Sequence, residues 1–329
     1  MAQSQTTQAA APAVYIPPVQ NVWGKRLKHL GRVARRNKLG AFGMVIVIFI
    51  LGMAILSPWV ARYDDNEPFQ TANPRYNPTA NPLDIAQDPG ISTPFILDRF
   101  EAPSWDHWFG TDQFGRDIYA RIVVGSQLAV IIGIGASIIA VASGTAVGLI
   151  SGYLGGWFDT IIQRIVDAIQ AFPGLVLLLL LASLLDEPNI PLTVGALGFL
   201  GFATSVRIVR ASVLSVSQMT YVEAARAYGS TDWRIMARHV FPNITASVLV
   251  VFSISIGAYI LAEASLSFLG LGPGDKTTWG KMVNSGRNAL ELHPWESLFA
   301  GTFITLAVLG FNLAGDALRD ELDPRLRGR

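Results

Sequence analysis

Residues 221–242 have the sequence YVEAARAYGSTDWRIMARHVFP and lie between two strongly apolar stretches. The charged side chains of this segment are Glu223, Arg226, Asp232, Arg234 and Arg238. Each of them would be costly at the centre of a lipid bilayer. We therefore expect the segment at a membrane surface and the apolar stretches on either side of it inside the membrane.

Helix signals divide this segment in two. Thr220 and Glu223 have the spacing of a capping box, so a short helix can begin there, and Gly229 suits a left-handed helix end. Ser230 or Thr231 can cap a second helix. That helix would carry an apolar stripe at Trp233, Met236, Ala237 and Val240. Two short helices joined at a glycine suit the docking of a soluble partner; the alternative is a surface helix that only connects two spans.

The composition is typical of a polytopic membrane protein. Of 329 residues, 51% are hydrophobic and 15% are charged, and the mean hydropathy is +0.39. The sequence has no cysteine, which excludes disulfide and thiol chemistry. The first 20 residues have the composition of a disordered tail and lack an apolar core, so we expect no cleaved signal peptide and a retained first span.

Six apolar stretches are long enough to cross a bilayer as helices, so the predicted fold class is all-α with six transmembrane helices. We expect these spans at about 39–60, within 122–149, and at 161–185, 192–213, 244–269 and 298–318. Pro173 predicts a kink in the third span, and Pro242 marks where the chain turns into the fifth. In the second span, small residues recur every four positions at Ala140, Gly144, Gly148 and Gly152, which predicts close helix packing.

Basic residues before the first span place the N-terminus in the cytoplasm. They are Lys25, Arg26, Lys28, Arg32, Arg35, Arg36 and Lys38. An even number of spans returns the C-terminus to the same side. The expected order is a cytoplasmic tail (1–38), the first span (39–60), an extracytoplasmic segment (61–120), a core of five spans (121–318) with a cytoplasmic loop at 213–242, and a cytoplasmic tail (319–329).

Several motifs resemble those of permease subunits of ATP-binding-cassette (ABC) importers. Glu223-Ala224-Ala225, Gly229 and Phe241-Pro242 are similar to the EAA loop of that family. Further stretches resemble the C-type permease of the dipeptide, oligopeptide and nickel branch. They are HWFGTDQFGRD at 107–117, GYLGGWFD at 152–159, AFPG at 171–174, LAEASLSFLGLG at 261–272, and the stretch 312–326. One departure is the segment 64–104, which is longer than expected for this branch and weakens any inference about the substrate.

The resemblance implies a type I ABC importer permease fold in the cytoplasmic (inner) membrane of a prokaryote, surrounded by lipid. It implies a homologous permease partner, two cytoplasmic ATP-binding subunits or domains, and an extracytoplasmic substrate-binding protein; nucleic acid is not an expected partner. It implies a di- or oligopeptide substrate, with nickel complexes, opines, glutathione-like peptides and oligosaccharides as alternatives. Coupling to the ATPases is expected at Tyr221, Glu223, Ala224, Ala225, Arg226, Gly229, Arg234 and Pro242.

Three ionisable side chains in or near the spans are further candidates. Arg164 and Asp167 are three residues apart and can pair on one helix face, either as a structural ion pair or in a functional role. Glu263 lies near the outer end of the fifth span, where it could contact another subunit or line a gate.

The sequence argues against an enzyme. In Gly270–Thr277, Asp275 separates the glycine from Lys276, so the segment does not form a Walker A phosphate loop. The four histidines lack zinc-site spacing, and Asp106, His107 and Asp112 are better explained as hydrogen-bonded loop residues than as a metal site. We therefore expect no cofactor in this chain, with ATP and Mg²⁺ in the partner ATPases. The alternative function is a gradient-driven secondary transporter, which would favour an internal repeat that we do not find.

Overall fold

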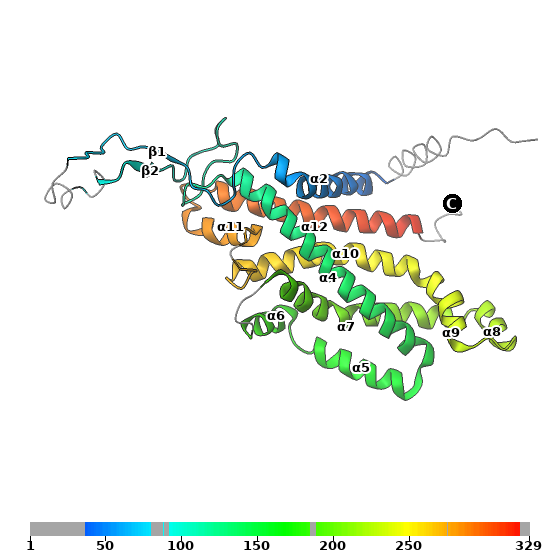
Figure 1. The fold of residues 1–329 in the computed structure, drawn as a ribbon. Helices are drawn as coiled ribbons and strands as arrows, with labels where there is room; N and C mark the ends of the chain where they lie inside the picture. Colours follow the sequence, from blue (N-terminus) through cyan, green and yellow to red (C-terminus); the bar gives the residue numbers. More distant parts are fainter. Residues whose placement is uncertain (1–36, 80–87, 89–91, 185–188, 275, 323–329) are drawn as a thin grey trace, which may run out of the picture. The chain divides into compact units, whose positions relative to one another are not determined.

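The computed structural model describes residues 37–79, 88, 92–184, 189–274 and 276–322 (Figure 1). Most of the basic N-terminal tail, part of the long outer segment and the C-terminal tail beyond Leu322 lie outside the described residues. The chain divides into two compact units, Met1–Lys38 and Leu39–Arg329. The following description concerns the second unit.

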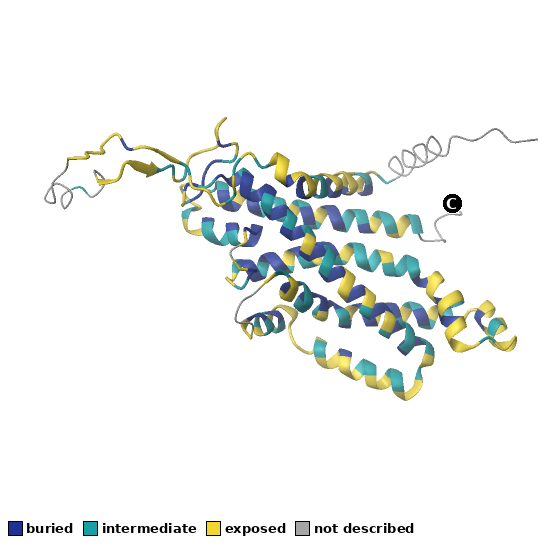
Figure 2. Ribbon diagram, viewed as in Figure 1, coloured by how far each residue is buried: buried dark blue, intermediate teal, exposed yellow. Residues whose placement is uncertain are grey.

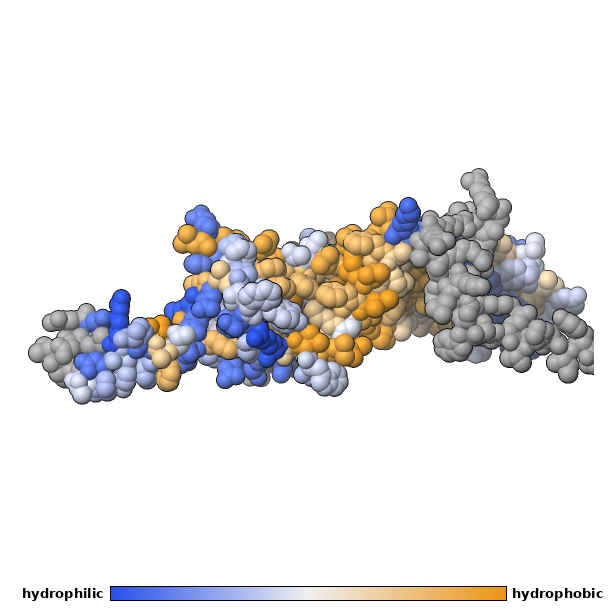
Figure 3. All heavy atoms as spheres, turned by 90° about the horizontal axis from the view of Figure 1, so that it is seen from above, coloured by the Kyte–Doolittle hydropathy of each residue, from blue (hydrophilic) through white to orange (hydrophobic). Residues whose placement is uncertain are grey.

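In the described part of the chain, five helical segments are long and apolar enough to cross a membrane. The helices are α2 (Lys38–Val60), α4 (Ile118–Leu154), α7 (Ile190–Ser217), α10 (Phe241–Phe268) and α12 (Trp295–Leu322). Each coincides with one predicted span. On the face shown in Figure 3, apolar side chains form a broad band, and hydrophilic side chains gather beyond it at the end that carries β1 and β2.

The third predicted span is broken. It consists of α5 (Gly156–Gln170) and α6 (Gly174–Ser183), and the chain bends by 80° between them. The break includes Pro173, which cannot donate a backbone hydrogen bond to continue a helix. We predicted a kink at this proline within one continuous helix at 161–185. The bend is much larger than a kink. Only if the pair counts as one span do the described residues contain six candidate spans.

Glycines in α4 allow close contact with α7, as the sequence predicted. A Cβ atom at Gly144 would lie 2.4 Å from the Cβ of Ser205, and one at Gly148 would lie 2.8 Å from the carbonyl oxygen of Val206. A Cβ at Gly152 would lie 3.1 Å from the carbonyl oxygen of Arg210. A side chain does not fit at the first two positions and would be tight at the third, so the two helices meet backbone to backbone over about two turns.

A second seam joins α2 to α12. A Cβ at Gly43 would lie 2.4 Å from the Cβ of Leu313, and one at Gly310 would lie 2.7 Å from Ile46. Next to this seam, the side chains of Ile50, Ile122, Ile260 and Trp279 are almost fully buried in one apolar core. Figure 2 shows the buried residues on the facing sides of the helices and exposed residues on their outer sides, which is the distribution expected of helices that face lipid.

Several short elements outside the spans were not predicted. β1 (Gln70–Ala72) pairs antiparallel with β2 (Phe95–Leu97), and Thr71 lies opposite Ile96. Between α10 and α12 lie α11 (Trp279–Gly286) and a 3₁₀ turn, η3 (Arg287–Ala289). The indole of Trp279 donates to the carbonyl oxygen of Ile122 (2.9 Å), which ties α11 to α4. The hairpin and α11 lie at one end of the helices, and α8 and α9 lie at the other (Figure 1).

The α4–α7 seam gives a direct prediction. Gly144→Val should destabilise the fold by about 1–3 kcal/mol, because the new side chain cannot fit against Ser205. The measurement is the midpoint of thermal unfolding in mild detergent. Gly301→Val in α12 is the matched control, because no atom lies within 4 Å of a Cβ placed there. Equal midpoints for the two variants would contradict the packing seam.

Candidate functional site

The loop predicted at 213–242 contains α8 (Thr220–Ala227), which begins at the expected residue. The capping box, however, is not formed. Met219 occupies the cap position, and no side chain caps the helix. The carbonyl oxygen of Met219 accepts instead from the backbone N–H groups of Val222 and Glu223 (2.9 and 3.3 Å). Thr220 therefore lies one position too late to act as the cap, and the prediction of a capping box was wrong.

Gly229 ends α8 in the left-handed conformation, as predicted, with φ of 75°. Its N–H donates to the carbonyl oxygen of Arg226 (3.0 Å), and the N–H of Ser230 donates to that of Ala225 (3.1 Å). This pair of bonds is a Schellman motif, which satisfies carbonyl groups that a helix end would leave free. A residue with a Cβ atom is strained at this φ, so the turn depends on glycine.

The second half of the segment differs from the prediction. α9 (Asp232–Ile235) passes through a π-helical turn, η2 (Met236–Val240), directly into α10, so residues 232–268 form one helix. The chain does not turn at Pro242. The N–H of Phe241 bonds to the carbonyl oxygen of Met236, five residues earlier, and this wide turn lets the helix pass the proline.

The predicted apolar stripe is also only partly correct. Met236 and Val240 are buried, but Ala237 is exposed and 71% of Trp233 is exposed. Ile235, which was not in the stripe, is fully buried. The π-helical turn changes the number of residues per turn, so the regular α-helical period does not hold across it.

The base of this loop is a compact apolar cluster. Val222 of α8, Ile235 of α9 and Val240 of η2 are fully buried against Val209 and Val213 of α7. We call residues 220–240 the knob, because α8, α9 and η2 project together from this cluster beyond α7 and α10 (Figure 1). The buried side chains fix α8 against the ends of two long helices.

The outer surface of the knob is aromatic and charged. Tyr228 is 91% exposed, and Tyr221 is also exposed. Of the predicted alanine pair, Ala224 is exposed and Ala225 is partly buried against the apolar base. Charged side chains are also exposed on this surface, among them Glu223, Arg226, Arg234 and Arg238. Exposed aromatic and arginine side chains on a firmly packed base are typical of a surface that binds another protein.

Tyr153, at the end of α4, links the two halves of the knob. Its hydroxyl donates to the carboxylate of Asp232 (2.8 Å) and accepts from the guanidinium of Arg226 (3.4 Å). The same guanidinium lies 5.5 Å from the centre of the tyrosine ring. Sequence reasoning missed this contact. Tyr153 lies in the motif 152–159, but that motif gives no sign that Tyr153 contacts residues more than 70 positions away along the chain.

Comparison with known proteins decides the family. Residues 144–328 match the family described as binding-protein-dependent transport system inner membrane component, and residues 27–82 match the N-terminal TM domain of oligopeptide transport permease C. The chain belongs to this permease family.

Similar proteins are named as peptide transport permeases. The permease is 36% identical over 294 residues to the oligopeptide transport system permease protein OppC of Bacillus subtilis, covering 89% of this chain and 88% of the relative. It is 35% identical to the dipeptide transport system permease protein DppC of Alkalihalophilus pseudofirmus, covering 93% and 90%. It is 41% identical over 237 residues to the glutathione transport system permease protein GsiD of Pectobacterium atrosepticum, covering 71% and 78%. The predicted resemblance to the C-type permeases is confirmed.

The three ionisable side chains predicted in or near the spans differ in exposure. Arg164 and Asp167 pair across one helical turn (3.9 Å), but Arg207 of α7 lies closer to the same carboxylate (2.6 Å), and all three side chains are at least half exposed. Glu263 is buried and accepts from the hydroxyl of Ser267 in its own helix (2.6 Å). A third ion pair, between Asp159 and Arg210, was not predicted.

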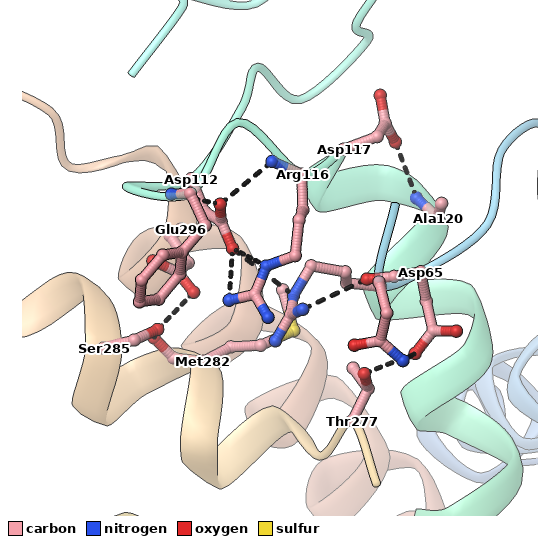
Figure 4. A network of polar contacts seen from close by, with 12 residues as sticks. Asp65, Asp112, Arg116, Asp117, Ala120, Thr277, Met282, Ser285 and Glu296 are labelled. Atoms are coloured by element: carbon pink, nitrogen blue, oxygen red, sulfur yellow. Dashed lines mark hydrogen bonds and ion pairs between the residues drawn. The ribbon is translucent and has the colours of Figure 1, made fainter. Parts of the chain in front are cut away.

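A polar cluster at the hairpin end holds the residues of the 107–117 motif (Figure 4). The carboxylate of Asp112 accepts from the guanidinium of Arg116 (2.7 Å) and lies 3.7 Å from Arg121. Arg121 also donates to the carbonyl oxygen of Asp65 (3.1 Å), and Ser285 of α11 donates to Glu296 of α12. The cluster thus connects the start of α4 to α11, α12 and the outer segment.

The histidine of the same motif makes a buried contact with an aspartate. Nδ1 of His107 lies 2.8 Å from the carboxylate of Asp117, and both side chains are buried. Asp117 also caps α4 by accepting from the N–H of Ala120 (2.7 Å). Within the described residues, no group of three histidine, cysteine, aspartate or glutamate side chains could hold a metal ion.

The base of the knob can be tested by hydrogen exchange. Val222→Ala removes two buried carbon atoms and should lower the free energy of opening of α8 by about 1–2 kcal/mol. The amides of α8 should then exchange faster, while those of α4 keep their rates. Ala227→Ser, at an exposed position of the same helix, should change neither set. Unchanged exchange in Val222→Ala would show that the cluster does not hold α8.

The polar cluster predicts that removing the charge of one buried carboxylate strongly lowers stability. Asp112→Asn should destabilise the permease by about 3 kcal/mol, because it leaves the buried guanidinium of Arg121 poorly compensated. Asp167→Asn removes a charge of the same kind from a half-exposed pair and should cost less than about 1 kcal/mol. The midpoint of thermal unfolding of each variant measures its loss of stability. Similar losses in the two variants would show that burial of the charge does not decide the effect.

Proposed function

We propose that this chain is a transmembrane permease subunit of an ATP-driven ABC importer for di- and oligopeptides. It would form a heterodimer with a homologous permease, bind two cytoplasmic ATP-binding subunits or domains, and receive substrate from an extracytoplasmic substrate-binding protein. The relatives named as oligopeptide, dipeptide and glutathione permeases support a small peptide as the substrate. Nickel complexes, opines and oligosaccharides are the alternative substrates within this branch.

The observation that carries the proposal is the knob. A loop that only connects two spans needs neither a buried apolar base nor an outward surface of large aromatic side chains. Here Val222 and Ile235 are fully buried, while Tyr228 and Trp233 face outward. We infer that Tyr221, Glu223, Ala224, Arg226 and Arg234 contact an ATPase, whereas Ala225, Gly229 and Pro242 support the shape of the knob.

We infer that the knob end of the helices is cytoplasmic and that the hairpin end is extracytoplasmic. Arg226, Arg234 and Arg238 lie at the knob end, as the excess of basic residues in cytoplasmic loops requires. Both termini would then be cytoplasmic, in the inner membrane of a prokaryote. ATP and Mg²⁺ would bind to the partner ATPases, and this chain would use no cofactor of its own.

The connections of the knob suggest how movement would pass into the membrane. α7 leads into α8 through Gln218 and Met219 alone, and α9 continues through η2 into α10 as one helix. When the ATPases close, displacement of the knob would therefore act directly on α7 and α10. We expect this movement to switch the peptide pathway between inward and outward access.

Two substitutions test the coupling role. Glu223→Lys reverses a charge on the outer surface, and Gly229→Pro cannot adopt the φ of 75° that ends α8. Both should abolish peptide uptake in cells and should reduce recovery of ATPase subunits when the chain is purified from its membrane in mild detergent. Both should leave the chain inserted in the membrane. Ala227→Ser, exposed on the same helix, should keep uptake within about twofold of wild type, since surface changes are usually mild.

Partner recovery distinguishes this proposal from a gradient-driven transporter. Purification of the wild-type chain should also yield a second permease and P-loop ATPases, identified by mass spectrometry. A chain that purifies alone and still transports peptide after reconstitution would refute the importer proposal. Normal uptake by both knob variants would refute the coupling role of α8.

A further inference from the structure

Helix α5 makes a small apolar contact with α7, in which Val166 packs against Ala203 and Val206. In this helix, every residue of which the structure describes, only Val166 is buried. At one end, the chain enters α5 through Gly155 and Gly156, which both have positive φ; a Cβ added at either glycine would meet no atom within 4 Å. At the other end lies the 80° bend before α6. The chain thus changes direction at both ends of α5, and polar contacts add to the small apolar contact that positions this helix.

The strongest of these contacts is a two-pronged ion pair with α7. Nε of Arg210 donates to one carboxylate oxygen of Asp159 (2.6 Å), and a terminal nitrogen donates to the other. The hydroxyl of Ser151, in α4, donates to the same carboxylate. The side chains of Asp159 and Arg210 are 13% and 29% exposed. A paired, partly buried geometry of this kind is stronger and more directional than a surface ion pair.

The partner of α5 in this contact belongs to a firmly packed part of the permease. Gly152 of α4 packs on the backbone of α7 at Arg210, at the last turn of the α4–α7 seam. Seven residues after Arg210, α7 ends at Ser217, and α8 begins at Thr220. The ion pair therefore attaches α5 to α7, the helix that leads into the knob.

We propose that Asp159 and Arg210 are positioning residues that make α5, and with it the broken span, follow the movement of α7. This inference rests on the proposed importer function for its mechanical meaning, but the geometric link can be tested separately. The second α5–α7 ion pair, Asp167–Arg207, has half-exposed side chains and contributes little to this link.

The first experiment measures the link itself. The chain has no cysteine, so spin labels can be attached at Ile161→Cys in α5 and Ser215→Cys in α7, both exposed positions. We expect a narrow distance distribution in the purified full chain and a clearly broader one after Asp159→Asn, which removes the charge at nearly constant size. The reversed pair, Asp159→Arg with Arg210→Asp, should restore the narrow distribution. An unchanged distribution in Asp159→Asn would overturn the proposal.

The second experiment measures coupling in the reconstituted importer. Peptide uptake per ATP hydrolysed should fall about tenfold in Asp159→Asn, and the reversed pair should recover most of it. ATP hydrolysis and recovery of the ATPase subunits should remain. Arg207→Gln, which breaks the exposed ion pair, is the matched control and should keep the ratio of the wild type.

The two experiments separate the possible failures. Wild-type complex that hydrolyses no ATP or takes up no peptide would refute the importer function, while the distance measurement would still decide whether the ion pair positions α5. A normal uptake ratio in Asp159→Asn would overturn the transmission role. A loss that the reversed pair does not repair, together with an unrepaired distance distribution, would also overturn it.

Discussion

The close contact between α4 and α7 is the constraint on which the rest of the structure depends. Within a membrane, water does not drive apolar helices together, so close backbone packing must hold them. Gly144, Gly148 and Gly152 supply that contact along about two turns. The seam ends beside the knob, where Tyr153 of α4 bonds to both α8 and α9. The two helices thus form one support for the knob and for the ion pair of Asp159.

This support separates the permease into firmly and loosely held parts. α4 and α7 share a backbone seam, and α2 and α12 share another. α5 and α6 have few buried side chains, a bend between them and a glycine turn before them. A transporter needs both kinds of element, because a movement has a direction only if one part stays fixed while another part moves.

Much of the fold could be predicted from the sequence because long apolar runs and glycine spacing are local signals. The spans and the left-handed turn at Gly229 follow from such signals. The failures have physical reasons. The sequence predicted a bend at Pro173 but could not give its size, since the packing of α5 and α6 sets the angle. The π-helical turn at Met236–Val240 has no local signature, and it interrupts the regular helical period on which the predicted stripe rested. Asp159 and Arg210 are 51 residues apart, so only the packed structure shows that they meet.

The unbroken helix over residues 232–268 has a consequence for the membrane surroundings of the permease. Its 37 residues make it about 55 Å long, whereas the hydrocarbon core of a bilayer is about 30 Å thick. The surplus length includes the charged turn at Arg234 and Arg238, which belongs in water. The helix is therefore long enough to extend beyond the hydrocarbon core at the end that carries the knob.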